Sequence, residues 1–255
     1  MIDSHAHLSA EQFDSDRTEV IARSRDAGVS WIEIGTTLED SRKALEFPHA
    51  SVGVHPNDIE GLTDADWDEL GALASHEHCH AIGEVGLDFS REGKLEDQEA
   101  VLKRFIALAQ QKNLPMIFHV RSAATGVEEA DAHQELIRIL RDYSNTNRPR
   151  GVIHTFSGSL AQAQEYIALG MMISFSGVIT FKNAGELPEI AKTIPLENIL
   201  VETDCPFLTP EPFRGKRNEP MYVKYAIQKI ADLRGVSFRE IEQATEHAAK
   251  RLFGI

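Results

Sequence analysis

The sequence contains only two cysteines, Cys79 and Cys205, so a disulfide framework is not indicated. It has no Pro/Gly-rich or low-complexity tract that would mark a linker. No apolar run approaches the roughly 18–20 residues of a membrane span, and the first residues lack the basic-then-apolar pattern of a secretory signal. We therefore expect one domain over residues 1–255, a cytoplasmic location, and neither a membrane nor an obligate protein partner.

The sequence also lacks an excess of basic residues, and its formal net charge is −14 at pH 7. Proteins that hold long nucleic acids through phosphate contacts are usually basic on at least one face. The charge therefore argues against a protein that coats duplex DNA. It does not exclude a pocket for one nucleotide end, because bound metal ions can supply positive charge locally.

Strand-like and helix-like segments alternate throughout the chain. Strands are expected at residues 1–8, 29–35, 51–54, 80–85, 115–120, 151–155, 171–175 and 198–203. Helices are expected at residues 9–27, 39–47, 67–73, 98–112, 133–143, 160–169, 186–193, 221–234 and 238–253. This order predicts a (β/α)8 TIM barrel of the metal-dependent hydrolase type with an extra C-terminal helix. An open doubly wound sheet would want a Gly-rich phosphate-binding turn after the first strand, and none is present.

The first strand carries the pattern Asp3-Ser-His5-Ala-His7. Side chains alternate along a strand, so Asp3, His5 and His7 share one face, where two imidazoles can bind one metal ion. A polar edge strand with two solvated histidines fits these residues as well. Residues further along the chain distinguish the two interpretations.

Histidines and carboxylates recur where later strands end: His55 follows the third strand, Glu84, His119 and His154 end the fourth to sixth, and Asp204 follows the eighth. Barrel enzymes build their active sites on this face. Singly, each is explained as a hydrogen-bonded core histidine or a solvated carboxylate. Burying the whole set unpaired would cost several kcal/mol per residue, whereas metal ions satisfy them together.

Four imidazoles and two carboxylates exceed the three protein ligands that a catalytic zinc site usually has. They match two divalent cations about 3.5–4 Å apart that share a carboxylate and a water. Such a pair lowers the pKa of the water and stabilises the attacking and leaving oxygens of a displacement. Mixed imidazole and carboxylate ligands suit Zn²⁺ and Mn²⁺, while Mg²⁺ prefers oxygen and water. The pattern therefore predicts a hydrolase but leaves its substrate open.

Motifs along the whole chain carry a resemblance to a known family. They are Asp3-Ser-His5-Ala-His7, Gly53-Val-His55-Pro56, Gly83-Glu84-Val-Gly86-Leu-Asp88, His119-Val-Arg121, His154-Thr-Phe-Ser-Gly158, Glu202-Thr-Asp204-Cys-Pro206 and Arg217-Asn-Glu-Pro220. Together they resemble the TatD family of metal-dependent deoxyribonucleases, within the amidohydrolase-like barrels. The resemblance implies hydrolysis of DNA from an end, in the 3′–5′ direction, and we expect single-stranded or frayed ends as substrate.

The resemblance also implies a ligand set. One cation would be held by His5, His7, Glu84 and Asp204, and the other by Glu84, His119 and His154. Glu84 then bridges the two ions, and Asp204 takes a proton from the attacking water. The resemblance points to Mg²⁺ in use, in disagreement with the ligand chemistry. Two positions depart from the family pattern: Ser122 replaces the usual Asp, and Asn57 replaces a frequent His. Neither is an expected ligand, so they bear on substrate fit.

Arg214, Lys216 and Arg217 form the one dense basic cluster, in the loop after the eighth strand. A solvated loop is one interpretation, but a place above the metal pair favours phosphate contact. We expect substrate contacts from these three residues and from His55 and Arg121.

Other candidates have simpler explanations. His76, His78 and His80 precede the fourth strand, so we expect them at the opposite end of the barrel without a catalytic role. Cys205 is expected to be a small buried filler rather than a ligand. The acidic residues 128–131 are expected to form a solvated helix start.

Two other functions remain open. The same metal-water chemistry allows a deacylase or amidase acting on an ester or amide such as an aminoacyl ester. A barrel that has lost catalysis and acts as a binding module is disfavoured, because every expected ligand is present.

Overall fold

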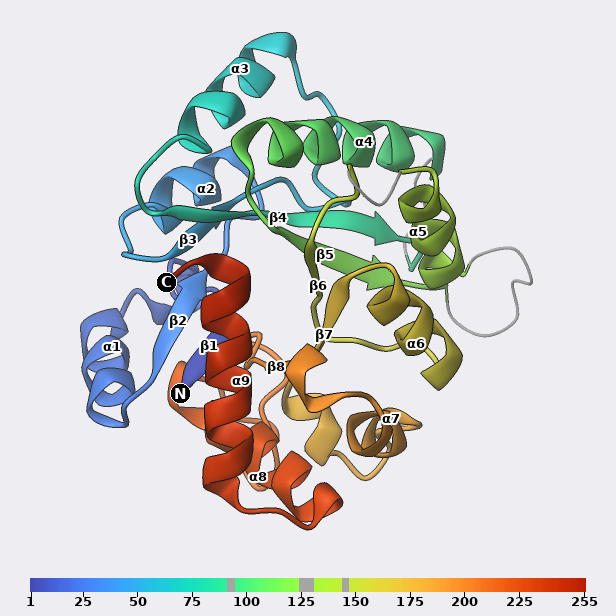
Figure 1. Ribbon diagram of the computed structural model, residues 1–255. Helices are drawn as coiled ribbons and strands as arrows, with labels where there is room; N and C mark the ends of the chain where they lie inside the picture. Colours follow the sequence, from blue (N-terminus) through green and yellow to red (C-terminus); the bar gives the residue numbers. More distant parts are fainter. Residues whose placement is uncertain (91–94, 124–130, 144–146) are drawn as a thin grey trace.

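The computed structural model describes residues 1–90, 95–123, 131–143 and 147–255 (Figure 1). Eight parallel strands form one sheet in chain order. They are β1 Ile2–Ala6, β2 Ser30–Glu33, β3 Ala50–Val52, β4 Cys79–Asp88, β5 Met116–Arg121, β6 Gly151–Ile153, β7 Met171–Phe175 and β8 Ile199–Val201. A parallel bridge between Ala6 and Cys205 brings the end of β1 beside the segment after β8 and nearly closes the sheet. The predicted (β/α)8 barrel is confirmed.

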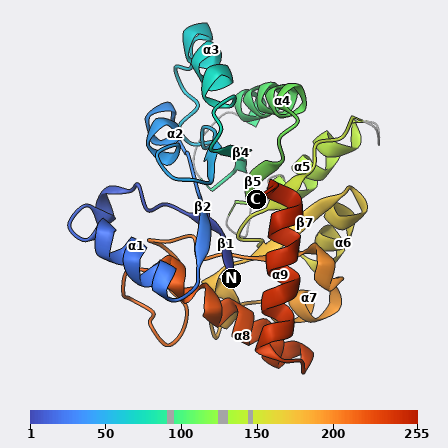
Figure 2. The same cartoon turned by 60° about the vertical axis from the view of Figure 1, so that its left-hand side comes forward.

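Helices lie between the strands and surround the sheet (Figures 1 and 2). They are α1 Arg17–Asp26, α2 Leu38–Ala44, α3 Asp64–Leu73, α4 Leu95–Lys112, α5 Ala132–Arg141, α6 Leu160–Ala168, α7 Leu187–Thr193, α8 Val223–Arg234 and α9 Phe238–Phe253. Short 3₁₀ turns are η1 Glu11–Phe13, η2 Gly177–Thr180, η3 Leu196–Asn198 and η4 Pro220–Tyr222. None of these helices, within the described residues, has the length and apolar character needed to cross a membrane.

The continuous helix predicted over residues 9–27 is wrong in its first half. The structure has the turn η1 there, and α1 begins only at Arg17. The Arg17 guanidinium explains the difference, because it donates hydrogen bonds to the carbonyls of Leu8, Ser9 and Ala10. These carbonyls therefore have partners without the i+4 amides of a helix. The segment stays compact as a turn at the end of β1.

The extra helix α9 lies across the amino-terminal end of the barrel. Its residues Ala249 and Phe253 belong to a buried apolar cluster with side chains from several strands, Ile2 and Leu200 among them. His80, next to the start of β4, bonds through Nδ1 to the carbonyl of Phe253. His80 therefore lies at the end of the barrel where the strands begin. The carboxyl-terminal end is left open for a site.

Candidate metal centre

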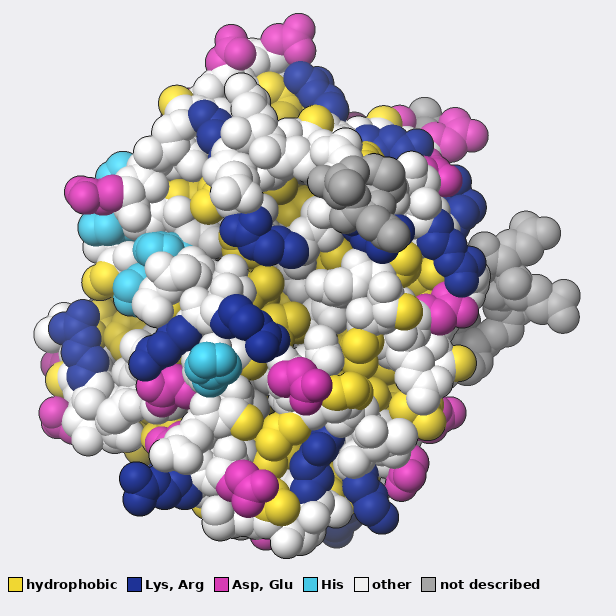
Figure 3. Space-filling view, in the orientation of Figure 1, with side chains coloured by type: hydrophobic (Ala, Val, Ile, Leu, Met, Phe, Trp, Pro, Cys, Tyr) yellow, Lys and Arg dark blue, Asp and Glu magenta, His cyan; other side chains and the backbone are white. Residues whose placement is uncertain are grey.

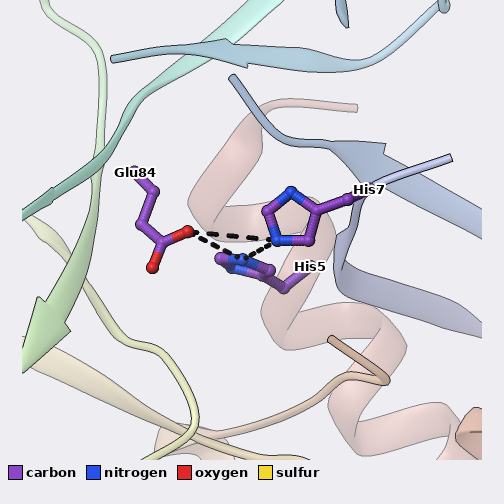
Figure 4. Close-up of side chains that lie close together, drawn as sticks. All are labelled: His5, His7 and Glu84. Carbon is purple, nitrogen blue, oxygen red and sulfur yellow. Dashed lines mark hydrogen bonds and ion pairs between the residues drawn. The ribbon is translucent and has the colours of Figure 1, made fainter. Parts of the chain in front are cut away.

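The first group of converging side chains comes from the end of β1 and from β4. The Nε2 atoms of His5 and His7 are 3.1 Å apart, and Glu84 Oε2 lies 3.3 Å from His5 Nε2 and 4.0 Å from His7 Nε2 (Figure 4). Asp204 Oδ1 approaches the same two nitrogens at 3.6 and 3.4 Å. Nitrogen and oxygen lone pairs gathered this closely repel one another unless protons or a cation lies among them.

The second group is built on the other oxygen of Glu84. Glu84 Oε1 lies 2.7 Å from His119 Nδ1 on β5 and 2.9 Å from His154 Nε2 after β6. The two imidazole nitrogens are 3.2 Å apart. The two oxygens of one carboxylate thus face two separate groups of nitrogen atoms. The structure brings together all six side chains that the sequence predicts as ligands, and metal binding by them stays a prediction.

The donor set in both groups fits divalent metal ions. His5, His7 and Glu84 form one group whose ligand atoms all lie within 4.8 Å of one another, and Glu84, His119 and His154 form another. Imidazole nitrogen together with carboxylate oxygen suits zinc and other divalent transition metals. The groups share Glu84, as a bridging ligand between two ions would require.

The electrostatics of the site call for added positive charge. Burial by itself raises the Glu84 pKa, but the charges of His154 and His5 and the hydrogen bonds from His119 and His154 hold it well below its ordinary value. Burial lowers the pKa of His154, yet Glu84 and Glu202 outweigh it and raise that pKa well above its ordinary value. The buried carboxylates therefore favour positive charge at this point of the site. A metal ion bound to the same atoms would supply that charge and displace protons from the imidazoles.

A second carboxylate, Asp88, orients His119. Asp88 Oδ2 lies 3.2 Å from His119 Nε2 and accepts a hydrogen bond from Asn57 Nδ2 at 3.0 Å. Ser90 donates to the other oxygen from both its amide and its hydroxyl. Carboxylates that hold the free nitrogen of a ligand histidine fix its ring and tautomer. Asn57, one of the two departures from the family pattern, thus positions Asp88.

Glu202 plays the same part for His154. Its side chain is fully buried, and Oε1 lies 3.4 Å from His154 Nδ1. The same oxygen accepts hydrogen bonds from the amide and the hydroxyl of Thr155 at 2.5 and 2.6 Å. Sequence reasoning quoted Asp88 and Glu202 within motifs but gave neither a role. The available signal was period-two spacing, which places Asp88 on the face of Glu84 and Glu202 on the face of Asp204.

Close backbone approach lets β4 and β5 present Glu84 and His119 to the same point. A Cβ atom at Gly86 would lie 1.9 Å from the carbonyl oxygen of His119. Any side chain at position 86 would therefore push the two strands apart. Gly86 is required by the strand pairing rather than by a turn.

The two groups lie at the bottom of a cavity of about 1030 Å³. His7, Glu84, His119, His154 and Asp204 line it, while His5 is fully buried. His55 and Arg121 also line the cavity, and substrate contact by them stays a prediction.

His55 is held as a neutral hydrogen-bond donor. Burial lowers the pKa of His55 to about 4. Its Nδ1 accepts a hydrogen bond from the Asn57 amide, which leaves the proton on Nε2. That Nε2 lies 3.8 Å from Glu84 Oε1. His55 is therefore able to donate to an oxygen bound at the centre.

The basic cluster of the β8 loop lies outside the cavity lining. Arg217 donates to both oxygens of Asp16 at 2.8 and 2.7 Å and to the carbonyl of Gln12. Arg214 lies over the ring of Phe181, 3.7 Å from its centroid, and Lys216 lies 5.6 Å from that of Phe213. The role expected of Arg217 is therefore revised: it ties the β8 loop to α1. No local pattern signals this pair, because its members are 201 positions apart in the sequence.

The remaining candidates have structural partners. Ser122 accepts a hydrogen bond from the Ala132 amide and donates to Asp131, which caps α5. Of the acidic run, residues 128–130 lie outside the described residues. Cys205 is fully buried, and burial raises the pKa of its thiol well above the ordinary value.

A (β/α)8 barrel with imidazoles and carboxylates gathered at the carboxyl ends of its strands defines a metal-dependent barrel hydrolase. The comparison with protein families identifies which one. The model of the TatD related DNase family matches residues 2–254, and the chain belongs to this family.

Relatives and solved structures agree over the full length. The chain is 41% identical to the uncharacterized metal-dependent hydrolase YabD of Bacillus subtilis, covering 100% of this chain and 99% of that protein. It is 34% identical to the 3′-5′ ssDNA/RNA exonuclease TatD of Pectobacterium carotovorum, covering 99% of each. The crystal structure of YjjV, a TatD homologue from Escherichia coli, superposes with a TM-score of 0.89 at 29% identity, covering 100% of this chain and 98% of that one. The chain is a metal-dependent hydrolase of the TatD family.

Proposed function

We propose that the protein removes nucleotides from the 3′ end of single-stranded or frayed DNA, using two divalent cations. The observation that carries this proposal is the division of Glu84, with one oxygen toward His5 and His7 and the other toward His119 and His154. The name of the Pectobacterium relative includes RNA as well as single-stranded DNA. RNA ends are therefore a second substrate to test.

The side chains divide into two candidate cation sites. His5, His7, Glu84 and Asp204 would hold one cation, and Glu84, His119 and His154 the other. Divalent cations held this way lower the pKa of water and neutralise charge that develops on phosphoryl oxygens. We expect the ions to be Mg²⁺, Mn²⁺ or Zn²⁺. Metal analysis of protein purified without chelators distinguishes among the three.

The chain's own residues supply positioning and proton transfer. Asp204 lines the cavity and accepts the proton of the attacking water. Asp88 and Glu202 hold the rings of His119 and His154, so that neither turns away during reaction. His55 donates from Nε2 to a phosphoryl oxygen. Arg121 is exposed at the cavity wall, and its side chain makes no hydrogen bond or ion pair with the described residues, which leaves it available to a phosphate.

The test uses 5′-labelled single-stranded DNA and RNA with protein of measured metal content. We expect a ladder of products that shorten one nucleotide at a time from the 3′ end. Exhaustive chelation should abolish the activity, and Mn²⁺ or Mg²⁺ should restore it, because the ligands serve the ions. An aminoacyl ester is assayed in parallel.

Each other outcome contradicts a stated part of the proposal. Undiminished turnover by protein shown to be free of metal would refute the role of the cations. Hydrolysis of the aminoacyl ester with intact oligonucleotides would favour a deacylase. Metal-loaded protein without turnover on any substrate would favour a binding module.

A further inference from the structure

The residues that line the cavity change in chemistry around the barrel. The segments after β2 and β3 and the end of β4 contribute polar residues: Thr36, Asp40, His55, Asn57, Asp58 and Asp88. The segments after β6, β7 and β8 contribute the polar residues Thr155 and Ser157 and most of the apolar lining. These apolar residues, which we call the apolar arc, are Phe156, Val178, Leu187, Phe207 and Leu208. Because the strands follow one another in chain order, the two sets occupy different sides of the rim. The metal-binding groups lie between them.

Phe207 gives the apolar arc an exposed edge. It is 54% exposed, and among the described residues it is the large hydrophobic side chain that is left open to solvent. Its ring centroid lies 6.5 Å from that of His7. An exposed phenyl ring beside the metal-binding residues has apolar area that a ligand can cover.

The backbone of Phe207 is held on both sides. Its amide donates to the carbonyl of Asp204 at 2.9 Å, and its carbonyl accepts a hydrogen bond from Asn218 Nδ2 at 2.7 Å. Asn218 is fully buried and also bonds the carbonyl of Thr203. The ring is therefore presented from a fixed turn, and a ligand that stacks on it does not have to order the loop.

The charges of the lining residues indicate where a phosphate and where a base can bind. The polar side of the rim includes Asp40, Asp58 and Asp88, which disfavour phosphate groups. Arg121, at the end of β5, is the one Lys or Arg among the described lining residues. A nucleotide avoids the acidic residues and contacts the arginine when its phosphates lie between the metal-binding groups and Arg121. Its uncharged base then lies against the apolar arc.

We propose that the apolar arc, through Phe207, binds the base of the nucleotide whose phosphate lies at the metal-binding groups. This subsite rests on the proposed function, which makes a nucleotide the substrate. Stacking of a base on an aromatic side chain contributes about 5- to 150-fold in affinity and tolerates every base, because each has a π-face. The subsite would therefore bind terminal nucleotides without base specificity.

The test compares two ligands that differ only in the base, deoxyadenosine 5′-monophosphate and 2-deoxyribose 5-phosphate. Their binding to Mn²⁺-loaded protein is measured by calorimetry. We expect the mononucleotide to bind at least about 5-fold tighter. Phe207→Ala should remove most of this difference and leave the affinity for the sugar phosphate unchanged. Phe207→Tyr keeps the ring and should keep the difference.

Phe213→Ala provides the matched control. Phe213 belongs to the same loop but does not line the cavity, so both affinities should be unchanged. Melting temperatures check that each variant is folded, and Phe207→Leu, which keeps apolar volume without a π-face, replaces Phe207→Ala if that variant unfolds. Equal affinity of the wild-type protein for the two ligands, or equal losses for both in the Phe207 variants, would overturn the subsite.

Binding of these ligands needs no hydrolysis, so the two proposals are separable. A base preference that depends on Phe207, in a protein that cuts no oligonucleotide, supports the subsite and refutes the nuclease. Stepwise cutting of oligonucleotides with no dependence on Phe207 supports the nuclease and refutes the subsite.

Discussion

Two roles are proposed for Asp204, because its carboxylate approaches both His5 and His7 and also lines the cavity. Asp204→Asn keeps the shape and one oxygen ligand but removes the basicity. We expect kcat to fall on the order of 10²-fold or more with a much smaller change in KM, as for loss of a proton acceptor. Steady-state kinetics on a single-stranded oligonucleotide, with metal content measured for both proteins, test this. A near-native kcat in a fully metal-loaded variant would mean that another group accepts the proton of the attacking water.

Arg217 was expected to contact phosphate, but in the structure its guanidinium is paired with Asp16. Hydrogen bonding to Arg217 is the main reason that the pKa of Asp16 is lowered to about 2. Arg217→Ala is expected to lower the melting temperature by about 2–4 °C near neutral pH, while KM for DNA stays unchanged. Lys216→Ala, the exposed neighbour in the same loop, should leave the melting temperature as it is.

The pH dependence of the Asp16–Arg217 pair has a definite sign. The carboxyl pKa is depressed in the folded state, so its stabilising contribution is complete above the ordinary value of 3.8 and is lost as pH falls toward about 2. The difference in melting temperature between wild type and Arg217→Ala should therefore be constant above pH 5 and shrink between about pH 4 and 2. A difference that grows on acidification would contradict the assigned pairing.

At the level of elements, the sequence predicts best what local signals determine. The bounds of β7 and α9 agree with the expected residues 171–175 and 238–253. Helix α9 begins after Ser237, which accepts a hydrogen bond from the Glu240 amide, and ends at Gly254 in a left-handed conformation. Such caps are short-range patterns that are visible in the sequence.

Element ends that depend on distant partners are not visible in the same way. Strand β4 runs to Asp88, beyond the expected end at residue 85, because its last residues pair with β5 up to Arg121. This extension is what places Asp88 beside His119. The convergence of the candidate ligand histidines was predictable because strand ends converge in a barrel. The carboxylates that orient them required the register between strands.

Gly86 in β4 allows a test of that register. At Gly86 an added Cβ atom meets the His119 carbonyl at 1.9 Å, whereas at Gly71 in α3 it meets no atom within 4 Å. Gly86→Ala is expected to lower the free energy of unfolding by about 1–3 kcal/mol or more and to weaken metal binding by displacing Glu84 and His119. Gly71→Ala should be neutral or stabilising by about 0.5–1 kcal/mol. Denaturant unfolding and metal titration of both variants measure these effects.

The importance of close β4–β5 pairing would be contradicted if Gly86→Ala unfolded at the same denaturant concentration as the wild type and bound metal with unchanged affinity. That result would mean that β4 and β5 can separate without cost to the centre. Loss of metal affinity without loss of stability would locate the effect in the ligands alone.

At the scale of the whole molecule, acidic residues outnumber basic ones. The formal net charge is −14. On the one face that Figure 3 shows, Lys and Arg side chains are interspersed with Asp and Glu. Arg217 is paired with Asp16, and Arg121 is the one Lys or Arg among the described residues of the cavity lining. The field of the protein as a whole repels nucleic acid, so affinity has to come from contacts close to the metal-binding groups.

This distribution predicts how binding responds to salt and to the form of the DNA. A site that contacts one or two phosphates should show a slope of about −1 to −2 in a plot of log affinity against log salt concentration. It should also require a free single-stranded end, because a phosphate inside a duplex cannot reach the bottom of the cavity. KM is measured at several salt concentrations on single-stranded, blunt duplex and closed circular DNA. We expect efficient cutting of the single strand, weak cutting of the blunt duplex and no cutting of the circle. Efficient cutting of the circle, or a slope steeper than about −5, would require an extended basic track outside the cavity and would contradict end recognition.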